Sequence, residues 1–332
     1  MQSLPEQTYQ AFRLHAEGER AAGRFERLPI TAPQAGQVLI RVRYSSINYK
    51  DALASHGLNA IIRDFPRVGG IDLTGVVEQS ADARWKSGDE VIVHGFGIGV
   101  QTDGGHAQYA LVQADHVMAL PHGLSLLDAA TVGVAGYTAG LSQYCMELNG
   151  LHPAMGSVLV TGATGGVGSM AIHLLAASGY EVTAMSGKPS EAVYLEGLGA
   201  RQIIGRIAAD ADPKPLLKGQ WAGAIDSVGG DTLAWLTRTM LPEGVIASFG
   251  NAAGAQLNTT VLPFILRGIK LLGINANSPM ATRERVWQRI AETANSEQLG
   301  ALRHEIALAD LPTWLDKTLN GQVRGRTVIR MD

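Results

Sequence analysis

The alternation of apolar and polar positions divides the chain into regions of different character. Up to about residue 125, apolar side chains recur at every second position in short runs such as Gln37–Tyr44 and Gly105–Val112, and turns such as Lys86–Asp89 separate the runs. Period two is typical of β-strands with one buried face. Short strands joined by turns indicate a small, irregular barrel rather than a parallel sheet.

From residue 126 the pattern becomes an alternation of apolar strands and helical periods. Strands are predicted at 157–161, 181–185, 201–204, 222–226, 244–249 and 269–274, and helices at 126–135, 137–148, 168–178, 189–198 and 230–240. Such alternation indicates a doubly wound parallel sheet with helices on both faces.

The pattern changes again near residue 278. A polar helix at 282–296 precedes a strand at 304–307, a helix at 310–319 and a strand at 326–331. This tail is too short to fold alone, so we expect it to return to the first domain. The prediction is an α/β protein in which residues 1–125 and 278–332 form one domain and residues 126–277 form a second, inserted domain.

The stretch from Ser157 to Gly168 carries the clearest chemistry. It predicts a buried strand, a turn with glycine at 162, 165 and 168, and the start of a helix. Glycines let a backbone approach a phosphate, and the helix N-terminus attracts the negative charge. In this strand–turn–helix context we expect a dinucleotide pyrophosphate to bind, although a tight turn without a ligand is the alternative. The predicted contacts are Thr164, Gly165, Gly166 and Val167.

The end of the second predicted strand favours NADPH over NADH. The strand at 181–185 is followed by Ser186, Gly187 and Lys188, where an NAD site usually carries a carboxylate for the ribose hydroxyls. A hydroxyl and a cation suit a 2′-phosphate instead, and Arg206 after the next strand adds a second cation. Either cation taken alone is equally consistent with an ordinary surface charge.

Composition excludes several other classes. The net charge is −3 with 17% charged residues, and we find no basic patch for nucleic acid. No apolar run reaches the ~18 residues of a membrane span, and from the first ten residues, which have no basic region followed by an apolar core, we expect no signal peptide. Cys145 is the only cysteine, which rules out an internal disulfide and a four-cysteine zinc site and is consistent with a cytoplasmic location.

Together these motifs resemble the medium-chain dehydrogenase/reductase superfamily, and within it the zinc-free quinone oxidoreductase branch and its acryloyl-CoA reductase (YhdH/YhfP-type) subgroup. The segments that carry the resemblance are 45–53 with its Asn-Tyr-Lys-Asp block, 70–77, 161–168, 221–229 and 259–267. The resemblance covers nearly the whole chain. It implies a GroES-like irregular β-barrel catalytic domain with an inserted Rossmann doubly wound parallel sheet.

The resemblance also addresses metal binding. Zinc members of the superfamily carry a ligand cysteine where this chain has Asn48, Tyr49 and Asp51. No histidine pair shows metal-ligand spacing, and His94 and His106 are more simply read as structural. We therefore predict no metal.

The activity that the resemblance implies is NADPH-dependent reduction of an activated C=C, with acryloyl-CoA as substrate and propanoyl-CoA as product. Asn48 and Asp51 are the expected catalytic residues, and Tyr49, Asn251 and Arg326 the further cofactor contacts, Arg326 at the pyrophosphate. The alternatives are a helix-capping role for Asp51, a core aromatic for Tyr49 and a simple turn for Asn251.

Two other functions are consistent with the same motifs: a broad quinone or enone reductase that uses the same hydride, and a catalytically silent NADPH-binding protein with a structural or sensing role. A CoA tail would need a basic rim, for which Arg63, Arg67 and Arg267 are candidates. The predicted strand at 269–274 resembles a dimer-forming edge, so a homodimer acting on a small-molecule substrate is expected.

Overall fold

A computed structural model describes residues 8–18, 20–207 and 214–331 of the chain. Its contacts define two compact units: unit 1 comprises Met1–Val134, Pro279–Glu284 and Leu299–Asp332, and unit 2 comprises Ala135–Ser278 and Arg285–Gln298. The division differs from the predicted one mainly at residues 285–298. These pack with unit 2, because Val286 and Ile290 lie against Gly140 of the same unit.

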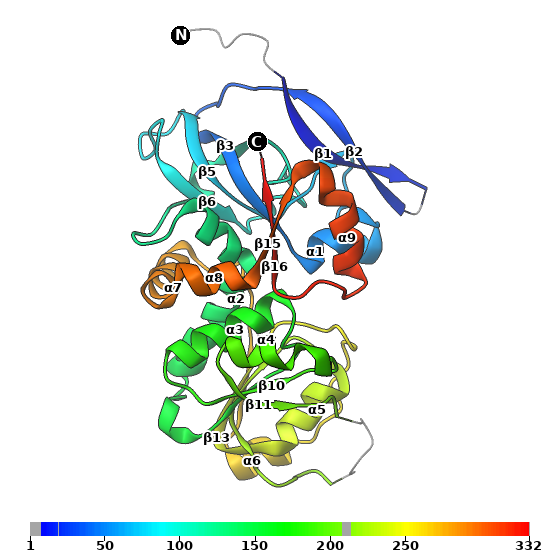
Figure 1. Cartoon of the computed structure of the whole chain (residues 1–332), viewed down its shortest axis with the longest axis vertical. Helices are drawn as coiled ribbons and strands as arrows, with labels where there is room; N and C mark the ends of the chain where they lie inside the picture. Colours follow the sequence, from blue (N-terminus) through cyan, green and yellow to red (C-terminus); the bar gives the residue numbers. More distant parts are fainter. Residues whose placement is uncertain (1–7, 19, 208–213, 332) are drawn as a thin grey trace. The chain divides into compact units, whose positions relative to one another are not determined.

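Unit 1 is built from antiparallel strands (Figure 1). Its larger sheet has the order β15-β16-β3-β5-β6-β8, with β7 paired to β3, and its smaller sheet has the order β2-β1-β4. The strands are β1 (Thr8–Glu17), β2 (Arg20–Pro29), β3 (Gln37–Ile47), β4 (Arg67–Val68), β5 (Asp72–Ser80), β6 (Glu90–His94), β7 (Tyr109–Gln113), β8 (Val117–Ala119), β15 (Arg303–Ala307) and β16 (Arg326–Arg330). The C-terminal β16 pairs antiparallel with β3, which places Thr327 opposite Ile47. It also pairs with β15, and that one pair is parallel.

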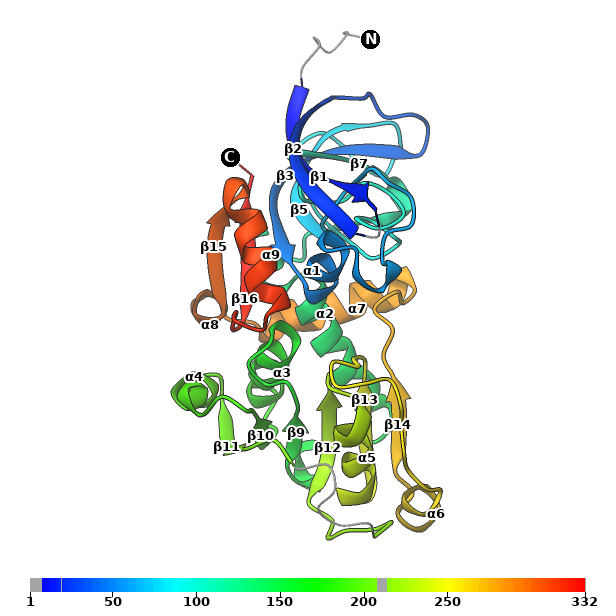
Figure 2. The same cartoon turned by 90° about the vertical axis from the view of Figure 1, so that its right-hand side faces the viewer.

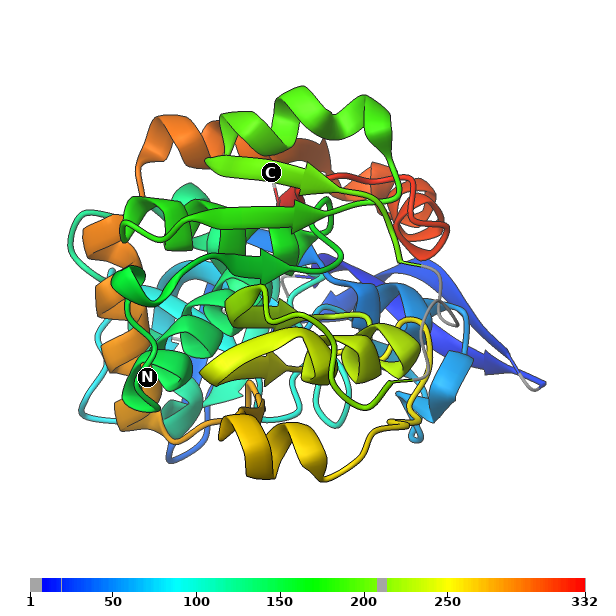
Figure 3. The same ribbon diagram turned by 90° about the horizontal axis from the view of Figure 1, so that it is seen from below.

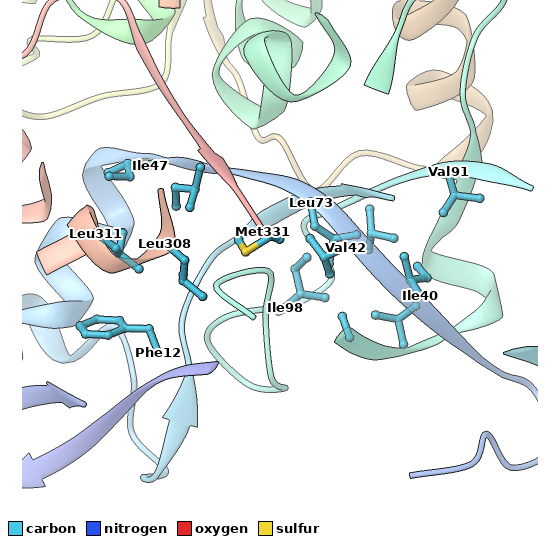
Figure 4. Packing of buried hydrophobic residues seen from close by; sticks show 14 of the residues in the cluster. Phe12, Ile40, Val42, Ile47, Leu73, Val91, Ile98, Leu308, Leu311 and Met331 are labelled. Carbon is cyan, nitrogen blue, oxygen red and sulfur yellow. The ribbon is translucent and has the colours of Figure 1, made fainter. Parts of the chain in front are cut away.

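One apolar core holds unit 1 together. Side chains from β1, β3, β5 and β6 meet others from α1 (Tyr49–Ser55), α9 (Leu311–Leu319) and β16. Figure 4 shows Phe12, Ile40, Leu73, Leu311 and Met331 in this cluster, all nearly or fully buried. The C-terminal tail thus contributes to the core of the N-terminal region.

Unit 2 contains a six-stranded sheet with the order β11-β10-β9-β12-β13-β14 (Figure 2), and all its pairs are parallel. The strands are β9 (Val158–Val160), β10 (Val182–Met185), β11 (Ala200–Ile204), β12 (Trp221–Asp226), β13 (Met240–Ser248) and β14 (Lys270–Gly273). In Figure 3 these green to gold strands lie side by side. The predicted α/β class with a doubly wound parallel sheet is confirmed.

Helices connect and flank the strands. They are α2 (Leu126–Leu148), α3 (Gly166–Ala177), α4 (Ala192–Gly197), α5 (Gly230–Thr239), α6 (Leu262–Arg267), α7 (Met280–Thr293) and α8 (Ser296–Leu302). Helix α3 packs on β9 and β10, and α5 on β12 and β13. The two helices predicted at 126–135 and 137–148 form one element, α2, which is interrupted at Gly133 by a backbone with positive φ (φ 49°, ψ −160°). The hairpin of β1 and β2 was not predicted.

Candidate functional site

The turn after β9 brings the three glycines close together. Gly162 has φ 57°, and a Cβ on Gly168 would lie 2.4 Å from the carbonyl oxygen of Gly162. Only glycine tolerates both conditions. Helix α3 starts at Gly166 with Gly165 as its N-cap, and residues 164–167 are half-buried, so this end of the helix is partly accessible to solvent. The predicted phosphate contacts therefore lie together at one helix N-terminus.

The buried carboxylate of Asp226 is hydrogen-bonded to Thr161, the residue just before this turn. Thr161 Oγ1 donates to Asp226 Oδ1 at 2.7 Å, which joins the ends of β9 and β12. Asp226 is fully buried and also accepts the N–H groups of Val228 and Gly229. Burial raises the pKa of the Asp226 carboxyl, and its hydrogen bond with Thr161 opposes that rise. Because each of these three partners is a donor, the ionised form fits these contacts. Sequence reasoning did not single out this residue.

The residues predicted to bind a 2′-phosphate lie at the ends of two neighbouring strands. β10 ends before Ser186, whose N–H donates to the Ile204 carbonyl of β11 at 3.0 Å, and Lys188 N donates to Ser186 Oγ at 3.1 Å. The Arg206 side chain lies over Gly187, since a Cβ on Gly187 would be 2.6 Å from Arg206 Nε. Arg206 is exposed and Lys188 is half-buried. A hydroxyl and two cations thus share this edge of the sheet.

Asn251 lies just beyond β13. It is exposed, and its carbonyl accepts the N–H of Gly254 at 3.0 Å in a turn. The Ala253 N–H donates to Val228 at 2.8 Å, which ties this turn to the segment after β12. Asn251 therefore lies at the same carboxyl edge of the sheet as the glycine turn.

In unit 1, Asn48 lies at the centre of a buried polar cluster. Its Nδ2 donates to Asp51 Oδ2 at 3.1 Å and to Asp72 Oδ2 at 3.0 Å. Its Oδ1 accepts from Arg326 Nη1 at 3.0 Å. Asn48 is 8% exposed, and all its amide groups are engaged inside the protein. The amide that was expected to face a ligand is held by protein partners.

Asp51 shows the capping geometry that the sequence offered as the alternative to a catalytic role. Its Oδ2 accepts the Asn48 N–H at 2.8 Å, so that the two residues form a capping box at the start of α1. Its Oδ1 accepts the Ile71 N–H at 3.0 Å. Burial raises the pKa of the Asp51 carboxyl, and nearby Asp72 adds to this rise.

Arg326 lies inside unit 1, which differs from the expectation that it reaches a pyrophosphate. The residue is 2% exposed. Its guanidinium donates to Thr131 O at 2.9 Å, Asn48 Oδ1 at 3.0 Å and Ser46 Oγ at 2.6 Å, and lies 3.7 Å from Asp72. These contacts engage all three nitrogens of the guanidinium. A carboxylate beside it explains why a buried arginine is tolerated.

The remaining candidates divide into exposed and structural groups. Tyr49 follows Asn48 and is 53% exposed, so it is not a core aromatic. His94 and His106 are buried and hydrogen-bonded: Arg283 Nη1 lies 2.9 Å from His94 Nδ1, and His106 Nε2 lies 3.3 Å from Ser46 O. Among residues 8–18, 20–207 and 214–331, no group of three or more His, Cys, Asp and Glu side chains could hold a metal ion.

The three arginines proposed as a CoA-binding rim differ in availability. Arg267 donates to the carbonyls of Arg238, Met240 and Leu217, so its guanidinium is used within unit 2. Arg67 lies 3.3 Å from Asp103, and Arg63 is exposed. The structure thus favours Arg63 over Arg267 for a role at the surface. No helix in the described part of the chain is long and apolar enough to cross a membrane.

Family models match both halves of this arrangement. A model described as the alcohol dehydrogenase GroES-like domain matches residues 34–122, and one described as zinc-binding dehydrogenase matches residues 166–292. The first range lies in unit 1, and the second lies mostly in unit 2. The chain belongs to the medium-chain dehydrogenase/reductase superfamily, a class of oxidoreductases.

The relatives narrow the class. The chain is 43% identical over 315 residues to the acrylyl-CoA reductase AcuI of Ruegeria pomeroyi, a match that covers 94% of this chain and 96% of the relative. The crystal structure of the YhdH oxidoreductase of Salmonella enterica in complex with NADP matches with a TM-score of 0.94 at 42% identity, over 97% of this chain and 100% of that one. Bacillus subtilis YhfP with NAD bound matches with a TM-score of 0.94 at 40% identity, over 98% and 99%. The resemblance predicted from the motifs is confirmed.

Proposed function

We propose that this protein is an NADPH-dependent reductase of the activated C=C of an enoyl thioester, and that it converts acryloyl-CoA to propanoyl-CoA. The observation that carries the proposal is the 43% identity to an acrylyl-CoA reductase over 94% of the chain. The paired cations beside Gly187 support the choice of cofactor. One related structure contains NADP and another contains NAD, so the relatives do not by themselves predict which of the two cofactors this chain prefers. The proposed preference for NADPH therefore rests on the residues of this chain.

The residues present fit a dinucleotide. A Cβ at position 168 would collide with the backbone of the glycine turn, and Thr164, Gly165, Gly166 and Val167 lie at the N-terminus of α3, where an anion is stabilised. Ser186, Lys188 and Arg206 would hold the 2′-phosphate, and Asn251 the nicotinamide half. When bound, the cofactor supplies a hydride to the β-carbon of the enoyl thioester, whose α-carbon then takes up a proton.

In unit 1, we assign a contact role to Tyr49 and supporting roles to Asn48 and Asp51. Tyr49 offers an exposed ring and hydroxyl beside the buried cluster, and it can pack against a nicotinamide or donate to a thioester oxygen as negative charge develops there. Asn48 and Asp51 hold the first turn of α1 and thereby fix the position of Tyr49.

A substrate panel tests the reaction. NADPH oxidation is followed with acryloyl-CoA, a simple quinone and a small enone. We expect the highest kcat/KM with acryloyl-CoA. Preference for the quinone or the enone would indicate the broader reductase, and tight NADPH binding without turnover on any substrate would indicate the silent binding protein.

The cofactor assignment has its own test. Lys188→Ala should weaken NADPH binding by at least about tenfold, because a charge-assisted contact to phosphate contributes about 1.5–3 kcal/mol, and should leave NADH binding unchanged. The matched control is Lys218→Ala, which removes a cation elsewhere in unit 2. Equal NADPH and NADH dissociation constants in the wild type and in Lys188→Ala would contradict the assignment.

We further propose that the protein forms a homodimer through the edge of the six-stranded sheet. β14 is the last strand of that sheet, and Val261, Ile265 and Leu266 around α6 are 63–69% exposed. An open edge beside an apolar patch favours pairing with a second copy. Light scattering should show a dimer that Ile265→Asp converts to a monomer. Val193→Asp, at an exposed position on α4, should leave the dimer intact, and a monomeric wild type would refute the proposal.

A cytoplasmic location is part of the proposal. A single cysteine leaves no internal disulfide to form, so the fold gains nothing from an oxidising compartment. Fractionation of cells that express the chain tests this directly.

A further inference from the structure

Asp72 connects three separate segments of unit 1 through one carboxylate. Oδ1 accepts the N–H of Ser46 at 3.1 Å and its hydroxyl at 2.5 Å. Oδ2 accepts Asn48 Nδ2 at 3.0 Å and the N–H of Val134 at 2.9 Å. The contacted residues lie at the end of β3, at the N-cap of α1 and directly after the break in α2. Asp72 is 3% exposed, so water does not compete for these bonds.

The contacts allow only one orientation of the Asn48 amide. Its Nδ2 faces two carboxylates, Asp51 and Asp72, and its Oδ1 faces the Arg326 guanidinium. A flipped amide would place its oxygen against both carboxylates and its NH₂ against a cation. The charges of the cluster therefore select the orientation that the hydrogen bonds require.

The Asp72 carboxylate lies so close to Gly133 that no side chain would fit at position 133. A Cβ on Gly133 would lie 2.7 Å from Asp72 Oδ2 and 2.5 Å from Arg326 Nη2. The Val134 N–H follows the break in α2 at Gly133, and it donates to Asp72. The helix break and the carboxylate thus depend on each other.

The buried cluster around Asp72 is connected to Tyr49 through the backbone of Asn48. The Asn48 carbonyl accepts the N–H groups of Asp51 at 2.9 Å and Ala52 at 3.2 Å, so the position of Asn48 sets the first turn of α1. Tyr49, which is half exposed, is the next residue along the chain. Displacement of Asn48 would therefore move the side chain to which we assign substrate or cofactor contact.

We propose that Asp72 is a positioning residue of the reaction, which fixes the Asn48 amide and through it Tyr49. The inference rests on the proposed function. Asp72→Asn preserves size but places an NH₂ among groups that are all donors. Because misplacement of about 1 Å can cost about 10²-fold in rate, we expect kcat with acryloyl-CoA to fall by about that factor. The Kd for NADPH should change far less, since its proposed phosphate contacts lie in unit 2.

The matched control is Asp128→Asn. Asp128 is another buried carboxylate of unit 1, at the first turn of α2, where it contacts Ser125 and Arg303. We expect it to lower the melting temperature and leave kcat close to wild type. If Asp72→Asn fails to fold, Ser46→Ala removes one bond to Asp72 and should lower kcat about tenfold.

Amide hydrogen exchange supplies a readout that does not need turnover. Asp72→Asn should accelerate exchange across residues 46–52, whereas Asp128→Asn should not. Wild-type kcat together with unchanged exchange in folded Asp72→Asn would overturn the inference. An inactive wild type would overturn the proposed function instead, and the exchange data would then still show whether Asp72 fixes this segment.

Discussion

At the scale of single residues, side-chain neighbours decide which groups can meet a ligand. Asn48 and Arg326 carry polar groups that suit a cofactor, yet both are buried and hydrogen-bonded to protein. At Gly187 the neighbouring polar group is exposed instead. Because Gly187 has no side chain, the guanidinium of Arg206 can lie against it. The Arg206 side chain occupies the volume in which a Cβ would lie, 2.6 Å from its Nε.

A carboxylate at position 187 should therefore reverse the cofactor preference. Gly187→Asp would displace Arg206 and add a negative charge where we expect the 2′-phosphate. NADPH binding should weaken by at least about tenfold, the effect of about 1.4 kcal/mol, while NADH binding is retained. Fluorescence titration with each cofactor measures this.

Gly205→Ala is the control for that variant. A Cβ on Gly205 meets no atom within 4 Å, so neither affinity should change. Undiminished NADPH binding by Gly187→Asp would show that the 2′-phosphate lies elsewhere.

At the scale of elements, the strand–turn–helix unit of β9 and α3 depends on backbone proximity. Gly168 lies in the first turn of α3, and its Cα faces the carbonyl of Gly162. Below the turn, Asp226 joins Thr161 to the segment after β12. Backbone packing on one side and the Asp226 hydrogen bonds on the other thus fix the conformation of the turn. A side chain at position 168 would meet backbone atoms of Gly162 and Ala163, which cannot move aside as a flexible side chain could.

Gly168→Ala should both destabilise unit 2 and abolish tight NADPH binding. The new methyl group would lie 2.4 Å from the Gly162 oxygen, so the turn must open. We expect a lower melting temperature and a loss of at least about tenfold in NADPH affinity, about 1.4 kcal/mol.

Gly197→Ala separates this effect from a general response to losing a helical glycine. Gly197 lies in α4, and a Cβ added there would meet no atom within 4 Å, so alanine should be neutral or stabilising by up to about 1 kcal/mol. If Gly168→Ala bound NADPH as tightly as Gly197→Ala, the glycine turn would not be the phosphate site.

At the scale of the whole molecule, each unit contains a buried histidine whose charged form is disfavoured. In unit 1, burial and the nearby Arg283 hold the pKa of His94 well below its usual value. In unit 2, burial lowers the pKa of His173, whose Nε2 has no hydrogen-bond partner among the described residues. Both are therefore neutral in the folded chain near neutral pH.

We expect the protein to lose stability in mild acid. Below the unfolded pKa of about 6.5, the unfolded chain binds protons that the folded chain does not, so the free energy of unfolding falls as pH falls. The stabilisation is complete above about pH 6.5, and its loss is about 1.4 kcal/mol per pH unit for each such histidine. Urea unfolding between pH 8 and pH 5 measures the slope.

His173→Leu should flatten that slope, because it removes a titrating group that makes no hydrogen bond through Nε2 to the described residues. His122→Gln, at an exposed position, should not alter it. A pH-independent free energy of unfolding in the wild type would contradict the assignment of neutral histidines.

The sequence alone predicted the class of the fold and the nucleotide turn, because both depend on local pattern. Periodicity separates strands from helices, and glycine spacing reports where a backbone must turn tightly. The hairpin of β1 and β2 was missed, since β2 is mostly exposed and its apolar and charged residues do not alternate regularly. The contacts of Asp72 and Asp226 were not predicted either, although a single carboxylate in an otherwise apolar strand was an available signal.

Only the tertiary structure decided which polar groups are buried and hydrogen-bonded to other protein groups. Asn48 and Asp72 are 24 residues apart in the sequence, and Asn48 and Arg326 are 278 residues apart, yet both pairs are hydrogen-bonded. No local pattern encodes such a contact, because it is made by strand pairing between the two ends of the chain. The chain thus determines its elements and its glycine turn by short-range geometry, whereas burial and long-range pairing decide which carboxylates and cations face a ligand.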